Sequence, residues 1–139
     1  MRMSSSNYII KGKEERMSTY QGTFSVQNLT GFDITNLTVM HTCNNYVDVI
    51  TSAALDGNAT TSTVTLNSED GYDDFWTVCY TLGNNVISFA HYNCNFEESD
   101  KGGNCSIVLS SSQSFSVDTP ESPSCSGIGL SSFSVTSVQ

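Results

Sequence analysis

Short stretches in which apolar and polar residues alternate constrain the fold of this chain more than any other feature. Phe24 and Val26 alternate with polar neighbours, and the pattern resumes, with one irregularity, through Ile34, Leu37 and Val39. A two-residue period places apolar side chains on one face of a β-strand. Further stretches of strand-like composition are YVDVIT, STVTLN, FWTVCYTL, VISFAHY, CSIVLS and SFSV. The chain therefore predicts about eight or nine short strands, and it shows no convincing helical period.

The links between these stretches favour the same class of fold. LDGNATT, NSEDGYDD, GNN and NFEESDKGGN are clusters of Gly, Asn and Asp, which accept the backbone angles of turns. TLGNNVI indicates a hairpin, and GIGLSSFSV in the tail is a candidate edge strand. Short strands at this spacing predict an all-β domain. We expect a single antiparallel β-sandwich, immunoglobulin-like in type, over residues 17–139.

Residues 1–16 differ in composition from the rest of the chain. They carry Arg2, Lys11, Lys13 and Arg16, and they lack the apolar core of a secretory signal. The run Lys-Gly-Lys-Glu-Glu-Arg before Met17 is what a purine-rich bacterial ribosome-binding site would encode ahead of a start codon. We therefore expect a non-native or disordered extension over residues 1–16. Five cysteines without an export signal leave two locations open, the cytoplasm or export without a cleavable signal peptide.

The acidic residues exclude several classes of partner. From Met17 onward Lys101 is the only Lys or Arg against twelve carboxylates, which gives this part of the chain a formal charge of −11. Phosphate backbones and anionic lipid headgroups are not attracted to such a surface, because both require clustered Lys and Arg. We expect no nucleic-acid partner. The sequence also has no run of about eighteen apolar residues, so we expect no transmembrane segment.

The five cysteines cannot all pair within one chain, and no CxxC motif indicates a zinc or redox site. Cys79 lies in an apolar stretch and is expected to be a small buried hydrophobe. Cys94, Cys105 and Cys125 fall at strand ends or in loops, where a bridge would tie the tail to the sheet. Spacing alone does not determine the pair, and Cys94 with Cys125 is the first choice.

The stretch EDGYDDFWTVCY places four carboxylates around a Gly-Tyr pair directly before a strand. Asp70, Asp73 and Asp74, with NFEESD as a second acidic loop, offer the oxygen ligands that calcium prefers. Their spacing departs from that of helix-loop-helix calcium sites, so a solvated acidic turn is favoured and calcium is the alternative. His41 and Cys43 point to one face of a strand, but the paired spacing of a zinc site is missing.

No catalytic motif emerges from the hydroxyl, thiol and imidazole groups. The serines include no GxSxG elbow. Cys43 or Cys94 with His91 is the best available nucleophile pair, yet no neighbouring cation marks an activated thiol. A domain of this size seldom supplies the cleft that paired carboxylates such as Asp73 and Asp74 need for glycoside hydrolysis. We expect no enzymatic activity and no cofactor apart from the calcium alternative.

Three motifs resemble, in their order, a family of small β-sandwich proteins. They are FSVQNLTGFDITNLTVMH, the acidic DGYDDFWTV, and CNFEESDKGGNCSIVLSSSQSFSVDTPESPSC. Nematode members of this family are named for being up-regulated in long-lived insulin-receptor mutants, and relatives occur in fungi and bacteria. The resemblance covers nearly all of Tyr20 to Leu130. It implies a bridge between Cys94 and Cys125 and supplies no catalytic residues.

The chain also departs from the pattern of that family. Phe75 stands where the family tends to have Tyr, and the other three cysteines are particular to this chain: Cys43, Cys79 and Cys105. A more distant likeness is to the aegerolysins, acidic β-sandwiches of similar length that bind membrane lipids. It rests on size, acidity and fold class, so an aegerolysin-like sandwich is an analogy.

We expect a non-enzymatic binding or interaction module, with a neutral lipid or a glycan as the leading ligand. The candidate ligand-binding residues are the aromatics near two loops, Tyr72, Phe75, Trp76, Tyr92 and Phe96. Aromatic side chains with one wet end suit both sugar stacking and membrane interfaces. Core packing competes with this role, above all for Phe75 and Trp76. The alternatives are a structural or stress-related protein whose edge strands form a homo-oligomer, and a calcium-binding module.

Overall fold

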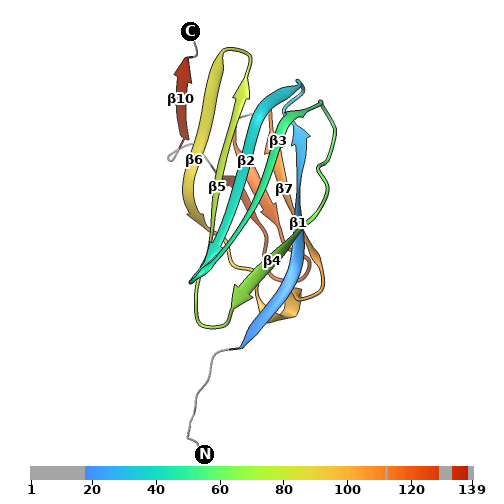
Figure 1. Ribbon diagram of the computed structural model, residues 1–139, viewed down its shortest axis with the longest axis vertical. Coiled ribbons are helices and arrows are strands. Elements are labelled where there is room, and N and C mark those ends of the chain that lie inside the picture. The colour runs from blue at the N-terminus through green and yellow to red at the C-terminus, as the bar shows by residue number, and fades with distance from the viewer. Residues whose placement is uncertain (1–17, 112, 129–132, 138–139) are drawn as a thin grey trace, which may run out of the picture.

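The computed structural model describes residues 18–111, 113–128 and 133–137. In these residues the chain forms ten strands and one short 3₁₀ helix, η1 (Glu98–Asp100) (Figure 1). The strands are β1 (Thr19–Leu29), β2 (Ile34–Cys43), β3 (Tyr46–Leu55), β4 (Val64–Glu69), β5 (Asp74–Leu82), β6 (Asn85–Asn93), β7 (Asn104–Ser110), β8 (Phe115–Asp118), β9 (Cys125–Ile128) and β10 (Phe133–Ser137). The extension over residues 1–16 lies outside the described residues.

Two five-stranded sheets pack face to face (Figure 1). The first has the order β4-β1-β7-β8-β9, and the second has the order β10-β6-β5-β2-β3. All neighbouring strands are antiparallel except β1 and β7, which pair in parallel. The predicted all-β sandwich is confirmed, as are the β5–β6 hairpin and an edge strand in the tail, β10. The parallel pair was not predicted, because alternation along one strand does not reveal its partner.

The core follows the two-residue period of the strands. In β5, Asp74, Trp76, Val78 and Tyr80 are buried, and the residues between them are partly exposed. The ring of Trp76 packs edge-on against Phe24 of the facing sheet, with ring centroids 5.4 Å apart. The largest fully buried side chains are Trp76, Tyr80, Phe24, Phe89, Phe96, Phe115, Ile34, Leu37, Leu66, Ile87, Ile107 and Leu109. Both sheets therefore contribute to one continuous apolar core.

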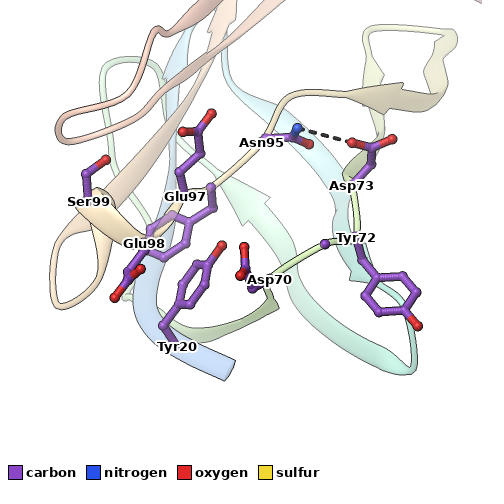
Figure 2. Close-up of a pocket in the computed structure, with 10 residues that line it drawn as sticks. Tyr20, Asp70, Tyr72, Asp73, Asn95, Glu97, Glu98 and Ser99 are labelled. Carbon is purple, nitrogen blue, oxygen red and sulfur yellow. Dashed lines mark hydrogen bonds between the residues drawn. The ribbon is translucent and has the colours of Figure 1, made fainter. Parts of the chain in front are cut away.

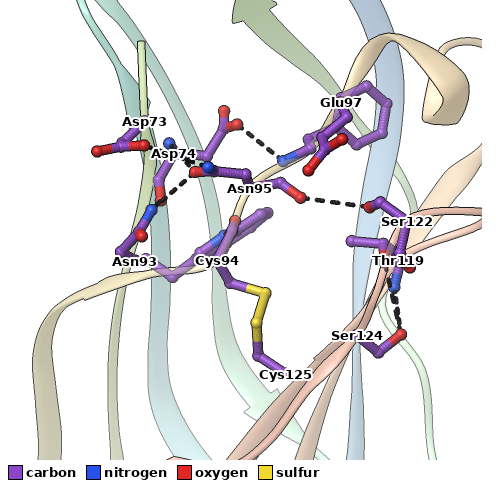
Figure 3. Close-up of a disulfide and its surroundings, with 12 residues drawn as sticks. Asp73, Asp74, Asn93, Cys94, Asn95, Glu97, Thr119, Ser122, Ser124 and Cys125 are labelled. Carbon is purple, nitrogen blue, oxygen red and sulfur yellow. Dashed lines mark hydrogen bonds between the residues drawn. A yellow bond between two sulfur atoms is a disulfide. The ribbon is translucent and has the colours of Figure 1, made fainter.

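A disulfide joins Cys94, just after β6, to Cys125 at the start of β9 (Figure 3). It links the two sheets at one side of the sandwich, and it is the predicted pair. Cys43, Cys79 and Cys105 are free thiols. Burial raises the pKa of Cys105 to about 12 and raises that of Cys43, so both thiols stay protonated at neutral pH. The prediction that Cys79 is buried was wrong, because its position in β5 alternates with the inward residues and faces outward.

The Tyr80 hydroxyl is buried and has no hydrogen-bond partner within the described parts of the chain. Burial raises the pKa of Tyr80 to about 12. A buried hydroxyl left unsatisfied costs about 1–3 kcal/mol. We expect Tyr80→Phe to keep the ring packing and to raise the free energy of unfolding by about 1 kcal/mol, measured by urea denaturation. Tyr72→Phe, at an exposed tyrosine, is the matched control, and a Tyr80→Phe protein less stable than wild type would contradict an unpaired hydroxyl.

Candidate functional site: an acidic cleft

A cleft of about 430 Å³ opens at the end of the sandwich where β1 begins (Figure 2). Three segments that are distant in sequence form its wall: the start of β1, the β4–β5 loop and the chain that leads into η1. The lining residues are Tyr20, Asp70, Gly71, Tyr72, Asp73, Asn95, Phe96, Glu97, Glu98 and Ser99. The Tyr20 ring and several side-chain oxygen atoms form the centre of this wall, and the Tyr72 ring points outward at its edge (Figure 2).

The β4–β5 loop is held in place by a sharp turn and by Asn95. Gly71 adopts a φ of 88°, a conformation that favours glycine, and the Tyr72 amide donates to the Glu69 carbonyl at 3.2 Å. The Asn95 side chain donates to Asp73 Oδ1 at 3.1 Å and accepts from the Asp74 amide at 2.9 Å (Figure 3). Asn95 thus connects the β4–β5 loop to the chain that leads into η1.

The cleft is strongly acidic. Four carboxylates line it, those of Asp70, Asp73, Glu97 and Glu98, and none of its lining residues is basic. Lys101 approaches Glu98 at 3.7 Å, but both side chains are exposed, so the pair contributes little. Burial, and to a lesser degree the negative charges of Asp74 and Asp70, raise the pKa of Tyr20. Its hydroxyl therefore stays protonated and can both donate and accept a hydrogen bond.

A buried hydrogen-bond network lies directly behind the cleft. Asp74 Oδ1 accepts from Ser68 Oγ at 3.0 Å and lies 2.7 Å from His41 Nε2, and Asp74 Oδ2 accepts from the Phe96 amide at 2.8 Å. His41 Nδ1 lies 3.0 Å from Asp48 Oδ2, which also accepts from the Asn67 amide at 2.8 Å. The network joins β2, β3, β4 and β5 to the chain that carries Phe96. The sequence singled out His41 and Asp74 but gave no signal that they meet.

The structure separates the five predicted aromatic residues. Tyr72 is 45% exposed and lines the cleft. Tyr92 is 38% exposed but lies on β6 outside the cleft, where its ring packs edge-on to Phe115. Phe75 stacks on His91, with centroids 4.2 Å apart. Neither cysteine that was weighed as a nucleophile beside His91 is an activated thiol, because burial raises the pKa of Cys43 and Cys94 is in the disulfide.

The assignment of Phe96 as an exposed ligand-binding residue was wrong, whereas Trp76 shows the core packing that competed with a binding role. Trp76 is fully buried, and its indole nitrogen donates to the Cys94 carbonyl at 2.9 Å. Phe96 is 1% exposed. Its ring stacks on the ring of Tyr20 from the inner side of the cleft, with the two centroids 6.1 Å apart. Phe96 was a ligand candidate because it stands next to an acidic loop. Strand alternation and the close approach of the Phe96 segment to β1 turn both rings inward instead.

The three predicted calcium ligands do not share one location. Asp70 and Asp73 line the cleft, whereas Asp74 faces the core and both of its oxygens accept hydrogen bonds. Within residues 18–111, 113–128 and 133–137, no three His, Cys, Asp or Glu side chains cluster as metal ligands would. His41 and Cys43 do face the same side, inward, but His41 contacts carboxylates at both ring nitrogens.

Asp100 fastens η1 to the proline-containing tail beside the cleft. Its Oδ1 accepts from the amides of Glu121 and Ser122 at 2.7 and 2.9 Å. Its Oδ2 accepts from the Ser122 hydroxyl at 2.6 Å and from the Glu97 amide at 2.8 Å. Burial raises the pKa of Asp100, but these hydrogen bonds together outweigh burial and lower the pKa below the ordinary value. The Asp100 carboxylate therefore has a structural role, whereas Glu97 and Glu98 line the cleft.

The lowered pKa of Asp100 predicts a loss of stability in acid. The Asp100 carboxylate binds a proton more weakly in the folded state than in the unfolded state. Its contribution to the free energy of unfolding is therefore fully present above the ordinary pKa of 3.8, and it is lost as pH falls through the lower folded-state pKa. We expect the free energy of unfolding to fall more steeply below about pH 4 in the wild type than in Asp100→Asn, which cannot titrate there. Urea denaturation across this range measures both slopes, and parallel slopes would contradict the assignment.

The sequence matches no protein-family model, and a search of curated proteins returned no match. Among the residues that the structure describes, no helix has the length and apolar character needed to cross a bilayer. Fold and site together define a two-sheet β-sandwich with an acidic, tyrosine-lined cleft at one end.

Proposed function

We propose that this protein is a non-enzymatic binding module that holds a neutral glycan in the acidic cleft. The observation that carries the proposal is the composition of the cleft wall. Tyr20 supplies an aromatic ring, Tyr72 supplies a second ring at the edge, Asn95 supplies an amide, and four carboxylates supply acceptor oxygens around an open volume of about 430 Å³ (Figure 2). No Lys or Arg lines the cleft to hold a phosphate or sulfate group.

The chemistry of a neutral sugar fits this wall. Sugar hydroxyls donate hydrogen bonds, and a carboxylate presents two acceptor oxygens to them. Aromatic rings with one polar end pack against the apolar face of a sugar while their hydroxyls remain hydrated. A neutral ligand is also not repelled by the negative field of the cleft, whereas an anionic ligand would be. The buried network behind the cleft holds the Phe96 segment in position, so the site is preformed.

Tyr72→Ala tests the proposal, because this ring is exposed and its removal leaves the core intact. We expect affinity for the best ligand in a panel of neutral cello-, malto- and chito-oligosaccharides to fall about tenfold, which is the loss of roughly 1.4 kcal/mol of ring contact. Titrations followed by amide chemical shifts measure the affinity and show whether Asp70, Asn95 and Glu97 respond.

Tyr92→Ala is the matched control, since it removes an exposed tyrosine outside the cleft. Its affinity should equal that of the wild type. If no oligosaccharide in the panel shifts cleft amides at concentrations up to about 10 mM, or if Tyr92→Ala weakens binding as much as Tyr72→Ala, the proposal fails.

A second candidate function, recognition of a neutral lipid surface, is favoured by the opposite end of the sandwich (Figure 1). Phe32, in the β1–β2 turn, is 65% exposed and Leu29 is 41% exposed. Phe32 also borders an open surface pocket of about 400 Å³ that Asp33, Leu82 and Gly83 line as well. An exposed aromatic at a loop tip suits the interface of a bilayer. Phe32 falls within the motif FSVQNLTGFDITNLTVMH, but the sequence analysis assigned it no binding role.

Co-sedimentation with vesicles of neutral phospholipid tests this candidate. We expect pelleting that is lost in Phe32→Ser and retained in Tyr72→Ala, because the two residues lie at opposite ends of the molecule. No pelleting of the wild type, or equal pelleting of both variants, removes the lipid candidate and leaves the glycan proposal standing.

A further inference from the structure

The outer edge of β3 is the longest free strand edge in the described part of the molecule. β3 spans ten residues and pairs only with β2, and residues 46–52 pair with residues 43–37 without a break. The other edge strands are shorter: β4 has six residues, β9 has four and β10 has five. At β4 the Asn67 amide already donates to Asp48 Oδ2. β3 is therefore the edge with the most backbone available for pairing.

Most of the devices that usually protect an edge strand are missing from residues 46–52 of β3. Proteins blunt such edges with proline, with a bulge, or with charged side chains that point outward or inward. The only one of these present is an inward charge, and both of its oxygens already accept hydrogen bonds within the fold. Between Tyr46 and Ser52 the strand has no proline and no register shift, and its one charged residue, Asp48, turns inward to His41 and Asn67. The exposed side chains in this stretch are instead uncharged: Val47 at 60%, Val49 at 41%, and Thr51.

Next to this edge, the outer face of the sheet carries no charged side chain over three rows of cross-strand neighbours. Each row runs from β3 through β2 to β5. The middle row runs Val49–Met40–Thr77, and the flanking rows run from Val47 to Phe75 and from Thr51 to Cys79. All of these residues are uncharged in a chain whose formal charge is −9. Two copies that approach at this edge avoid the like-charge repulsion that most of the acidic surface imposes.

We propose that β3 pairs with β3 of a second copy in an antiparallel, two-fold arrangement centred on Val49. Alternate residues of an antiparallel strand direct their amide and carbonyl groups to opposite sides. The two-residue turn after Cys43 makes Tyr46 the first residue bonded to β2, so Val47, Val49 and Thr51 face the free edge. Centring on Val49 places these three residues opposite Thr51, Val49 and Val47 of the second copy, which allows about six hydrogen bonds.

This register is self-complementary in charge and in side-chain type. It continues the Val49–Met40–Thr77 row into the same row of the second copy, and it places Asp48 opposite Ile50 rather than opposite the second Asp48. A seven-residue strand is about 24 Å long, so the pairing buries on the order of 500 Å² per copy. That area lies near the lower end of specific interfaces, and the dimer is accordingly weak, with a dissociation constant in the high micromolar range.

Sedimentation velocity of the full chain, from about 10 µM to 1 mM, tests the dimer. The wild type is expected to shift from monomer to dimer across this range, and Val49→Lys is expected to weaken the dimer at least tenfold. Ala90→Lys, which adds the same charge at an exposed position of β6 far from β3, should leave the dimer unchanged. A wild type that stays monomeric, or a dimer that Val49→Lys and Ala90→Lys affect equally, overturns the proposal.

Cysteine trapping tests the register independently. In the proposed arrangement the Cα atoms of the two Val49 residues lie about 5.5 Å apart, within reach of a disulfide. Val49→Cys should form a covalent dimer under mild oxidation, and the wild type, which already carries a free Cys79, should not. If Val49→Cys gives no more covalent dimer than the wild type, pairing centred on Val49 is wrong.

Discussion

Asp74→Ala is expected to lower the free energy of unfolding by about 3–5 kcal/mol, because it leaves several buried polar groups without a hydrogen-bond partner at a cost of about 1–3 kcal/mol each. Asp74 is 1% exposed, and its two oxygens contact His41 Nε2, Ser68 Oγ and the Phe96 amide. Removing the carboxylate leaves three buried polar groups without their partner, and each carries a desolvation penalty. The expected loss of stability far exceeds the loss caused by removing a carboxylate at the surface.

Urea denaturation of the wild type, Asp74→Ala and Asp73→Ala measures this effect. Asp73 is the adjacent residue and an exposed carboxylate that lines the cleft, so its removal should change stability by no more than about 0.5 kcal/mol. Because Asp74 also anchors the Phe96 amide, the Asp74→Ala protein should show altered amide shifts at residues 95–99. Equal stability of the two variants would mean that the buried network does not hold this end of the sandwich together.

Loss of the Cys94–Cys125 disulfide is expected to cost about 3–4 kcal/mol. The bridge closes a loop with a sequence separation of 31 residues, and restricting a loop of this length in the unfolded chain accounts for a free energy of this size. Cys94 is buried and its carbonyl accepts the Trp76 indole hydrogen bond, so the bridge also fixes the chain that packs on the core.

The cost is measured by comparing the Cys94→Ala/Cys125→Ala protein with the wild type in urea, with Cys79→Ala as the control for a free thiol. Cys79→Ala should change the free energy of unfolding only slightly, because Cys79 is only partly buried and lies on the outer face of the sheet. Asn95 follows Cys94 directly, so the double variant should also weaken any oligosaccharide that binds in the cleft. A double variant as stable as Cys79→Ala would show that the Asp100 contacts alone hold the tail.

The local parts of the candidate site were accessible from the sequence. EDGYDD predicted an acidic turn before a strand, and Asp70, Tyr72 and Asp73 do line the cleft. The second half of the cleft, Glu97 and Glu98, belongs to the other acidic loop, which the sequence analysis named only as a second source of calcium ligands. Tyr20 had no distinguishing signal, because a tyrosine near the start of a strand has no composition that marks a ligand site.

The sequence by itself determined the strand periods, the turns and the scarcity of basic residues from Met17 onward, because these depend on residues close in the chain or on composition alone. Only the tertiary structure decided which strands are neighbours, including the parallel pairing of β1 with β7. It also decided that Asp74 and Phe96 turn inward while Asp70 and Tyr72 face solvent. The physical reason is that a strand's period assigns side chains to two faces, whereas burial of a face depends on which distant segment packs against it.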